Sequence, residues 1–515
     1  MPRRISLITS VVAALLVAPA AAQAANTYVD DDAATDTPPC DMADPCQQIN
    51  TALFDAGPGE TTFVDGGTYS GGTALPANGR SLIFQEFNVP DGPAIIDNGG
   101  TPAIQVDDGT TAGTIQGLTL RGSFFAASVL GSATLIGNTF DDDVDNTGFP
   151  SLAILLDDSG ESVAVTNNSF SDPIVADDQF GIQSVTHANA TTTISGNTIT
   201  GFRKGIEVQS DSSGTQQLSG NMITGTHDVS GMPGLPGIGI WVEGGTAELT
   251  ANRIQQPGSS PLGNIGISVF PGASPSVDVT LQRNQVYNMS YSGVDLSDTT
   301  SATLNGDVIA NGAGAGLSSV ENNNLGLGNV TARNVTAWGN GTDISIADAD
   351  LTLTSSIVED PLGVSDSDPD GDPTQPPDPA CTITFSRGPT ITPGGNGCAN
   401  FQTTAAPGFV DPTTGINNFH LTTGSPMIDM GSTVPPPPMT LDVDGDARAL
   451  DGNCDGIARA DIGADELVRD CSTPVAPTPT PLTPITPPPP SGTTVKKKKK
   501  CKKKRSQTKG CKRKK

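Results

Sequence analysis

Apolar and polar residues recur in this chain with a long period, from about residue 115 to residue 359. A short phrase returns in most repeats, for example as ISGNTIT at 194–200, LSGNMIT at 218–224 and LTANRI at 249–254. We take its Asn, or the residue that stands in its place, as the mark of each repeat. The marks are Leu118, Asn138, Asn168, Asn197, Asn221, Asn252, Asn284, Asp307, Asn334 and Ser355. Successive marks lie 20 to 32 residues apart, and a recurrence of this length is the signature of a solenoid.

The spacing within the phrase indicates which solenoid it is. Apolar residues stand three positions before most marks and two positions after them, as Leu218 and Ile223 do around Asn221. A straight strand would place two such residues on opposite faces, whereas a corner lets both point inward. Asn and Gly tolerate the left-handed backbone that such a corner needs. In a second phrase, such as GIEV at 205–208, apolar and polar residues alternate as they do in half-buried strands. The pattern predicts an all-β fold, a right-handed parallel β-helix.

The N-terminus precedes these repeats with two segments of its own. Residues 1–24 have two arginines, a short apolar run and a small-residue cleavage pattern, which together predict an export signal. The apolar run is too short to span a membrane, and we expect no transmembrane segment elsewhere. Ile49, Leu53 and Phe54 fall on one face of a short predicted helix, which we expect to cap the open end of the solenoid.

Changes in composition divide the rest of the chain. We expect the cap and the β-helix coils over residues 25–365, and the last coils with a C-terminal segment over 366–471. Residues 472–495 are rich in proline and predict an extended linker. Residues 496–515 form a Lys-rich tail, which we expect to be disordered.

Charge separates the tail from the body. The formal net charge is −28, but the tail holds 14 of the 27 basic residues and no acid, so the remainder carries 13 basic against 55 acidic residues, a net of −42. We expect the tail to bind a polyanion, either an acidic polymer of the cell wall or envelope or, as the alternative, nucleic acid. Together with the export signal, this leads us to expect a protein outside the cell, at its surface or wall, and we expect a monomer.

The eight cysteines lie in close pairs along the sequence. An even number, an export signal and local pairing favour disulfides over metal ligands. The candidate pairs in the body are Cys40 with Cys46, Cys381 with Cys398, and Cys454 with Cys471; a fourth, Cys501 with Cys511, lies in the tail.

Two parts of the chain resemble known families. The coils resemble the right-handed parallel β-helix proteins of the pectate-lyase-like superfamily. The C-terminal stretches FHLTTGSPMIDMGS at 419–432, LDVDGDAR at 441–448 and ADIGADE at 460–466 resemble the choice-of-anchor Q segment of surface β-helix proteins. The resemblance implies an exported, surface-associated β-helix. It implies no particular reaction, because one fold hosts lyases, hydrolases, epimerases and adhesins.

One set of polar residues is a candidate catalytic site. The coil marked by Asn197 has a short loop between two longer ones, which predicts a notch in the surface. Its candidate residues are Arg203, Lys204, Asp177, Asp178 and His227. Acidic side chains that hold Ca²⁺ beside a basic side chain suit the abstraction of a proton next to a uronate carboxylate. The alternative is that Arg203 and Lys204 only balance nearby acids, in which case their replacement should cost little stability.

A second set of acidic residues is a candidate calcium site. The stretch DGNCDGIARADI at 451–462 begins like a calcium-binding loop. Asp451, Asn453 and Asp455 occupy the first ligand positions, and Asp461 could complete the shell. The alternative is a solvated turn held by a disulfide.

Together these observations predict an exported cell-surface β-helix protein that interacts with carbohydrate. Two alternatives stay open: a Ca²⁺-dependent polyuronate lyase that uses the notch, and a purely structural or adhesive surface protein. If the protein is an enzyme, the resemblance implies a pectate-lyase-like polysaccharide lyase.

Overall fold

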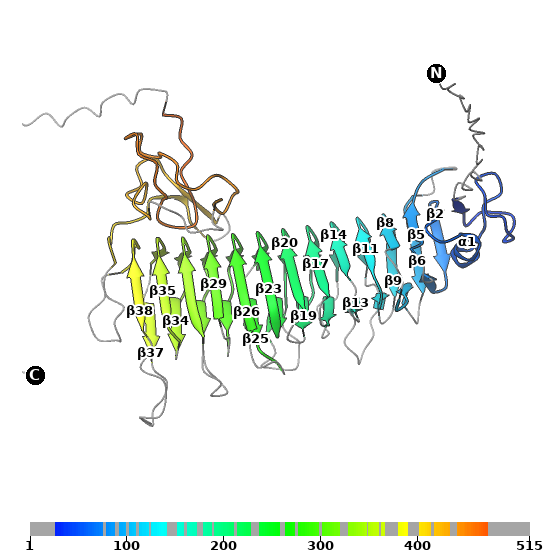
Figure 1. Ribbon diagram of the computed structural model, residues 1–515, viewed down its shortest axis with the longest axis horizontal. Coiled ribbons are helices and arrows are strands. Elements are labelled where there is room, and N and C mark those ends of the chain that lie inside the picture. The colour runs from blue at the N-terminus through cyan, green and yellow to red at the C-terminus, as the bar shows by residue number, and fades with distance from the viewer. Residues whose placement is uncertain are drawn as a thin grey trace, which may run out of the picture. The chain divides into compact units, whose positions relative to one another are not determined.

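The computed structural model describes most of the chain between residues 26 and 471 (Figure 1). The stretches that it leaves undescribed within that span are 76–78, 88–91, 99–101, 110–112, 123–124, 142–151, 159–161, 173–178, 188–189, 211–213, 228–235, 258–262, 273–276, 298–300, 320–327, 348, 360–361, 366–379, 390–400, 414–416 and 433–439. The contacts place Met1–Arg469 in one unit and Asp470–Lys515 in another. The predicted signal, linker and tail lie outside the described residues.

Three long parallel sheets make up the body, and each coil from β2 to β37 contributes one strand to each sheet. The first sheet consists of β1 (Thr27–Val29), β2 (Thr61–Val64), β5 (Ser81–Phe84), β8 (Gly113–Gln116), β11 (Ala133–Ile136), β14 (Val163–Thr166), β17 (Thr191–Ser195), β20 (Thr215–Ser219), β23 (Gly245–Thr250), β26 (Val277–Gln282), β29 (Ser301–Asn305), β32 (Asn329–Arg333), β35 (Leu351–Thr354) and β38 (Cys381–Thr384).

The other two sheets have twelve strands each. The second sheet consists of β4 (Thr73–Leu75), β7 (Ile104–Val106), β10 (Phe125–Val129), β13 (Leu152–Asp158), β16 (Phe180–Thr186), β19 (Lys204–Ser210), β22 (Gly237–Glu243), β25 (Asn264–Phe270), β28 (Ser292–Leu296), β31 (Ala315–Ser319), β34 (Thr342–Ala347) and β37 (Leu362–Ser365). The third sheet consists of β3 (Gly67–Ser70), β6 (Ala94–Asn98), β9 (Thr119–Gly122), β12 (Thr139–Asp141), β15 (Ser169–Ser171), β18 (Thr198–Thr200), β21 (Met222–Thr224), β24 (Arg253–Gln255), β27 (Gln285–Tyr287), β30 (Val308–Ala310), β33 (Thr336–Trp338) and β36 (Ile357–Val358).

Neighbouring strands in these sheets come from successive coils, which confirms the predicted parallel β-solenoid (Figure 1). The apolar residues of the repeated phrase stack inside: Ile199 pairs with Ile223, and Ile223 with Ile254. All three are at most 1% exposed. Each coil therefore buries its apolar residues against the coils on either side, as a solenoid requires.

The asparagine marks form a continuous buried ladder. The Asn221 Oδ1 accepts hydrogen bonds from the backbone N–H of Asn197 (3.0 Å) and from its Nδ2 (2.9 Å). The same pair of bonds links Asn138 to Asn168, Asn168 to Asn197, Asn221 to Asn252, and Asn252 to Asn284. The line of corners is thus confirmed. The backbone of the preceding residue, such as Gly196 or Gly220, is what adopts the positive φ.

The last two marks were assigned one residue too early. Leu304 pairs with Ala332 across β29 and β32, so the position aligned with Asp307 is Val335 rather than Asn334. In the next coil the aligned residue is Ser356 rather than Ser355, because the Val335 N–H bonds to the Ser356 hydroxyl. Asn334 and Ser355 have φ near 50° and are the left-handed residues of their corners.

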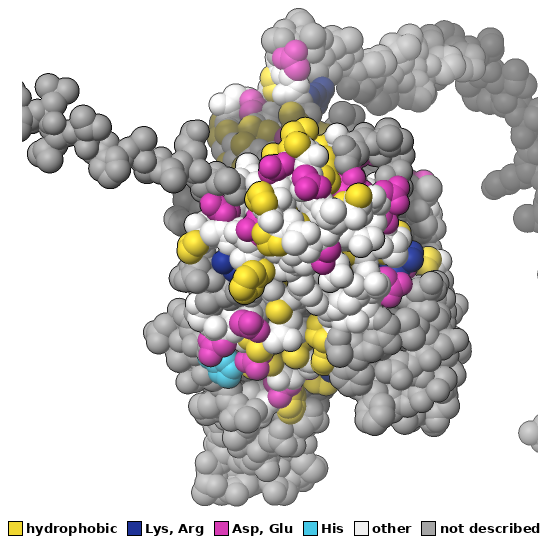
Figure 2. All heavy atoms as spheres, turned by 90° about the vertical axis from the view of Figure 1, so that its right-hand side faces the viewer, with side chains coloured by type: hydrophobic (Ala, Val, Ile, Leu, Met, Phe, Trp, Pro, Cys, Tyr) yellow, Lys and Arg dark blue, Asp and Glu magenta, His cyan; other side chains and the backbone are white. Residues whose placement is uncertain are grey.

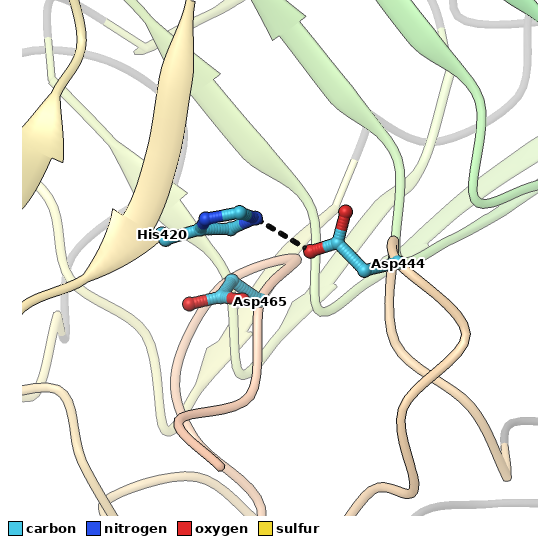
Figure 3. Close-up of side chains that lie close together, drawn as sticks. All are labelled: His420, Asp444 and Asp465. Atoms are coloured by element: carbon cyan, nitrogen blue, oxygen red, sulfur yellow. Dashed lines mark hydrogen bonds and ion pairs between the residues drawn. The ribbon is translucent and has the colours of Figure 1, made fainter.

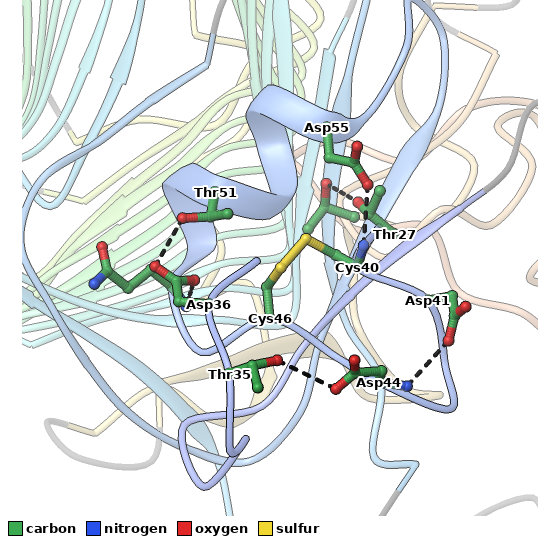
Figure 4. Close-up of a disulfide and its surroundings, with 11 residues drawn as sticks. Thr27, Thr35, Asp36, Cys40, Asp41, Asp44, Cys46, Thr51 and Asp55 are labelled. Atoms are coloured by element: carbon green, nitrogen blue, oxygen red, sulfur yellow. Dashed lines mark hydrogen bonds between the residues drawn. A yellow bond between two sulfur atoms is a disulfide. The ribbon is translucent and has the colours of Figure 1, made fainter. Parts of the chain in front are cut away.

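At the N-terminal end, the helix α1 (Ile49–Asp55) lies against β1, β2 and β4. Ile49, Ala52 and Leu53 are buried, but Phe54 is 87% exposed, so its predicted place on the buried face is wrong. The Cys40–Cys46 disulfide is confirmed and lies next to the helix (Figure 4). The Asp55 carboxylate accepts the Cys40 N–H (3.0 Å), which ties the end of the helix to the disulfide.

The remaining cysteines among the described residues agree with the disulfide prediction. Cys381, Cys454 and Cys471 are each disulfide-bonded. Cys398, Cys501 and Cys511 lie outside the described residues.

The segment from residue 401 to residue 469 packs against the third sheet. It contains an antiparallel pair, β39 (Phe409–Asp411) and β40 (Asn418–Leu421). Phe409 packs edge-on against Trp338 at 5.1 Å, and Phe419 stacks on Tyr287 at 6.1 Å. The Asn334 Nδ2 donates to the Asp461 carbonyl and the Ala464 N–H to the Thr336 hydroxyl. The coils therefore provide the surface on which this segment folds.

Candidate functional site

The predicted notch is only partly within the described residues. Asp177 and Asp178 lie outside them. Arg203, Lys204 and His227 are 5%, 6% and 8% exposed. The expectation that these side chains are exposed is therefore wrong, and the expectation that they can be replaced at little cost loses its basis.

Lys204 is buried because it begins β19 between two aromatic rings. It pairs in register with Phe180 in the preceding coil and Ile238 in the following one. Its Nζ lies 4.9 Å from the centroid of the Phe180 ring and 3.4 Å from that of Trp241. The same Nζ donates to the Glu207 Oε2 at 2.7 Å. Lys204 is therefore a buried ion-pair partner in contact with aromatic rings.

Glu207 is a fixed anion in this arrangement. Its Oε1 accepts hydrogen bonds from Gln209 Nε2 (2.6 Å) and Gln183 Nε2 (3.4 Å), while its Oε2 accepts the Lys204 bond. Gln183, Glu207 and Trp241 stand in one row across β16, β19 and β22. Charge-assisted bonds of this kind hold a carboxylate in one orientation.

Glu243 completes the group. It follows Trp241 by two residues, so both side chains point away from the core while Ile240 and Val242, each 0% exposed, point into it. Burial raises the pKa of Glu243, and the negative charge of Glu207 adds to this effect. Among the described residues, Glu243 forms no hydrogen bond or ion pair with another side chain. We call Gln183, Glu207, Gln209, Trp241 and Glu243 the Trp241 patch.

This patch has little signature in the sequence. Its members stand at alternate positions of ordinary strand phrases, where outward polar residues are expected in any solenoid. The signal that could have found them is the register of the repeats, which puts Gln183, Glu207 and Trp241 at the same place in successive coils.

A groove of about 330 Å³ lies beside α1 at the N-terminal end. Polar side chains dominate its lining, among them the amides of Gln47, Gln48 and Asn50 and the hydroxyls of Thr68 and Ser70. Figure 2 shows this end of the molecule, on which acidic side chains are spread over the surface with few basic ones among them. The groove can form hydrogen bonds but has no basic group to attract an anion.

The predicted calcium loop has carboxylates that mostly bond to its own backbone. Asp451 accepts the N–H groups of Asp455 (3.0 Å) and Gly456 (2.8 Å), and Asn453 Oδ1 accepts that of Asp455. Asp461 is instead 0% exposed, and its two oxygens accept the N–H groups of Asp429 and Leu467. The structure does not bring Asp461 together with the other three residues. Calcium binding at Asp451, Asn453 and Asp455 stays a prediction.

Buried charges hold the surrounding segment together. Glu466 accepts the N–H groups of Leu450 and Asp461, and its Oε2 lies 3.7 Å from Arg448 NH1. Burial raises the pKa of Glu466 to about 8, and the negative charge of Asp461 contributes to the shift. Burial likewise raises the pKa of Asp461 to about 6. Glu466 and Asp461 are therefore buried structural residues that bond the backbone of the segment, and they are not exposed ligands.

A separate cluster does bring metal-ligating groups together. His420, Asp444 and Asp465 each offer one ligand atom, and these atoms lie within 4.8 Å of one another (Figure 3). The His420 Nε2 lies 2.7 Å from the Asp444 Oδ2. This bond raises the pKa of His420 to about 9. The sequence analysis missed the cluster because its members lie on three segments whose proximity no local pattern reveals.

No helix among the described residues has the length and apolar character needed to cross a membrane.

Comparisons with known proteins agree with this fold. Residues 180–360 match the family model described as the right handed beta helix region. The solved structure of pectate lyase Pel9A is similar over 86% of this chain and 97% of its own, with a TM-score of 0.42 and 12% identity. A rhamnogalacturonan lyase is similar over 64% of this chain and 87% of its own, with a TM-score of 0.29 and 13% identity. No curated protein matches the chain. Residues 180–360 therefore have the family signature of a right-handed β-helix.

Proposed function

We propose that the protein binds carbohydrate on the outward face of β16, β19 and β22, at the Trp241 patch. The observation that carries the proposal is the position of the Trp241 ring beside Glu243, a carboxylate with no hydrogen-bond or ion-pair partner among the described residues. Carbohydrate sites combine an aromatic ring, which packs on the C–H face of a sugar, with planar polar groups that bond its hydroxyls. Gln183, Gln209 and Glu243 supply such groups, and the buried Glu207 holds the two amides in place.

The charge of the patch favours neutral or amino sugars over uronates. Lys204 is occupied by Glu207, and Glu243 adds a second carboxylate. The body around the patch carries a formal charge of −42, so a polyuronate meets like charge on approach. The polyuronate-lyase alternative needs a basic group that reaches the substrate, and the burial of Arg203 and Lys204 weighs against it.

Binding assays with three polymers test the proposal: a neutral glucan, a chitosan oligosaccharide and a polygalacturonate. We expect the first or second to bind and Trp241→Ala or Glu243→Gln to weaken that binding at least tenfold, about 1.4 kcal/mol. Glu248→Gln is the matched control, because Glu248 is an exposed glutamate on β23 of the first sheet. Phe54→Ala is the control for an exposed aromatic residue.

The same samples distinguish the alternatives. If both patch variants still bind and Gln48→Ala does not, the carbohydrate site lies in the groove beside α1. A rise in absorbance from unsaturated product, dependent on Ca²⁺, would establish the lyase. Absence of binding to all three polymers by the wild type would leave the structural or adhesive function.

We also propose that the protein is exported and held at the cell surface by its basic tail. The signal-like residues 1–24 and the Cys40–Cys46 disulfide support export, because disulfides persist in oxidising compartments. The anchor-like phrases at 419–432 and 460–466 support a surface location by resemblance.

A further inference from the structure

The cluster of His420, Asp444 and Asp465 joins three stretches of the C-terminal segment. His420 lies on β40, Asp444 in the loop 441–446, and Asp465 in the phrase ADIGADE at 460–466. His420 and Asp444 are exposed, whereas Asp465 is 7% exposed. The cluster is therefore open to solvent at His420 and Asp444 and buried at Asp465.

Backbone hydrogen bonds fix the relative positions of these stretches. The Asp465 Oδ2 accepts the N–H of Leu421, the residue after His420, at 2.7 Å. The fully buried Asp442 accepts the N–H groups of Asp444 (3.0 Å) and Glu466 (3.0 Å). The Val443 N–H donates to the Ala464 carbonyl at 3.1 Å, so each candidate ligand lies next to a residue that is bonded to another of the three stretches. A site with this support needs little rearrangement to bind an ion.

We propose that His420, Asp444 and Asp465 bind a divalent transition metal ion of the zinc class. One imidazole nitrogen and two carboxylate oxygens suit such an ion, whereas Ca²⁺ prefers a shell made of oxygen alone. Three protein ligands leave a position for water or for a ligand atom from outside.

The His420–Asp444 pair requires only a small movement to bind an ion. An imidazole nitrogen and a carboxylate oxygen on one tetrahedral zinc ion lie about 3.3 Å apart, given bonds of about 2.0–2.1 Å. The His420 Nε2 and the Asp444 Oδ2 are 2.7 Å apart as they stand. The ion takes the place of the hydrogen that they share, and the two exposed side chains spread by about half an ångström. Asp465 has one oxygen on the Leu421 N–H and its other oxygen for the ion.

The site would act as a clamp on the C-terminal segment. A metal ion that binds the folded protein and not the unfolded chain raises the stability of the folded state. The three ligands join β40 to two loops that follow it, so the gain in stability should fall on this segment. Carbohydrate binding at the Trp241 patch does not depend on it.

Calorimetric titration of the full-length protein, stripped with EDTA, tests the site with ZnCl₂, MnCl₂ and CaCl₂ in separate runs. We expect Zn²⁺ to bind and to raise the midpoint of thermal unfolding, and Ca²⁺ to do so much more weakly. His420→Gln and Asp444→Asn should each lower the number of bound Zn²⁺ ions by one. In the wild type, Co²⁺ should give a visible absorption band that both variants lack.

The chain contains a matched control. His187 pairs with Asp157 at 3.0 Å, with side chains 45% and 48% exposed, against 53% and 38% for His420 and Asp444. No third ligand joins the His187 pair among the described residues. His187→Gln should therefore leave Zn²⁺ binding unchanged. The proposal is overturned if the wild type binds no Zn²⁺, if His420→Gln binds as many ions as the wild type, or if His187→Gln loses as many as His420→Gln.

Discussion

Asn284 and Asp307 form the last step of the buried ladder. The Asp307 Oδ1 accepts hydrogen bonds from the backbone N–H of Asn284 at 2.7 Å and from its Nδ2 at 2.9 Å. The Asp307 Oδ2 accepts the Asn305 N–H at 2.9 Å. In the next coil the aligned residue is Val335, which has no acceptor. A carboxylate suits this place because it accepts bonds from the coil before it and has no N–H₂ group that would need a partner in the coil after it.

Asp307 should make the stability of the coils depend on pH. Burial raises the pKa of this fully buried acid to about 7, against an ordinary value of 3.8. Between pH 4 and pH 7 the folded state then keeps a proton that the unfolded state has lost, so the free energy of unfolding falls as pH rises. Asp307→Asn should reduce that fall, by as much as about 4 kcal/mol. Urea unfolding from pH 4 to pH 8 measures how the free energy of unfolding changes with pH in the wild type and in Asp307→Asn.

The exposed Asp278→Asn variant on β26 is the control for this measurement. The buried acids Asp461 and Glu466 shift in the same direction, so part of the pH dependence should remain in Asp307→Asn. Equal pH dependence in wild type and Asp307→Asn would contradict the assignment.

Asn221 should be costly to replace although it touches no ligand. Asn221→Ala removes the acceptor of two Asn197 donors and the donor to the Ile194 carbonyl. Each buried group that loses its partner costs about 1–3 kcal/mol. The neighbouring Met222 is 43% exposed, and Met222→Ala should stay within about 0.5 kcal/mol of the wild type. Similar unfolding midpoints in urea for the two variants would argue against the ladder as a source of stability.

Lys204 should behave as a structural residue. Lys204→Ala leaves the Glu207 carboxylate buried without its cation, a change that costs about 3–5 kcal/mol in comparable cases. The double variant Lys204→Met/Glu207→Gln removes both charges and should recover much of that loss. Thermal or urea unfolding gives the coupling energy between Lys204 and Glu207. The samples are the wild type, the variants Lys204→Met, Glu207→Gln and Lys204→Ala, and the double variant. Additive losses in the double variant would mean that the two side chains do not act as a pair.

The basic tail should hold the protein on polyanions. Deleting residues 496–515 removes 14 positive charges and should release the protein from an acidic polymer or an envelope fraction at low salt. Retention of the full-length protein should fall steeply with salt, because such contacts are screened over about 8–10 Å at moderate ionic strength. Co-sedimentation at increasing NaCl concentrations measures both effects. Retention that salt does not change would indicate a covalent or apolar attachment.

Most of the fold follows from one local phrase, because every coil must solve the same packing problem. Two apolar side chains point inward around each corner, and the asparagine between them bonds to the next coil. Both requirements concern a few adjacent residues, so they appear as a local sequence pattern. The pattern predicted the wrong residues at the corners of the coils after Asp307, where the asparagine ladder ends. Asn334 looks like a mark by residue type, but Val335 holds that position, and Asn334 bonds to the Asp461 carbonyl of the C-terminal segment.

The sites were harder to predict because they depend on side chains that meet in space. Loop lengths predicted an exposed notch at Arg203 and Lys204, yet the pairing of Lys204 with Glu207 and its contact with Trp241 bury it. Glu207 is three residues away on the same strand, and Trp241 comes from the next coil across an undescribed insertion. His420, Asp444 and Asp465 are brought together by backbone bonds that no periodicity encodes.

The direction of the ladder limits where this protein can change its length. A whole coil can be added or removed between Asn138 and Asn284 without leaving a donor or acceptor unpaired, provided that an inserted coil brings its own asparagine to the corner. A coil placed directly after Asp307 needs no asparagine at its corner, because the carboxylate has no side-chain N–H to offer to the coil that follows it. Tyr287 and Trp338, on which the C-terminal segment packs, lie on either side of this position. Among chains built on this plan, coils that carry the asparagine should therefore be gained or lost before Asp307.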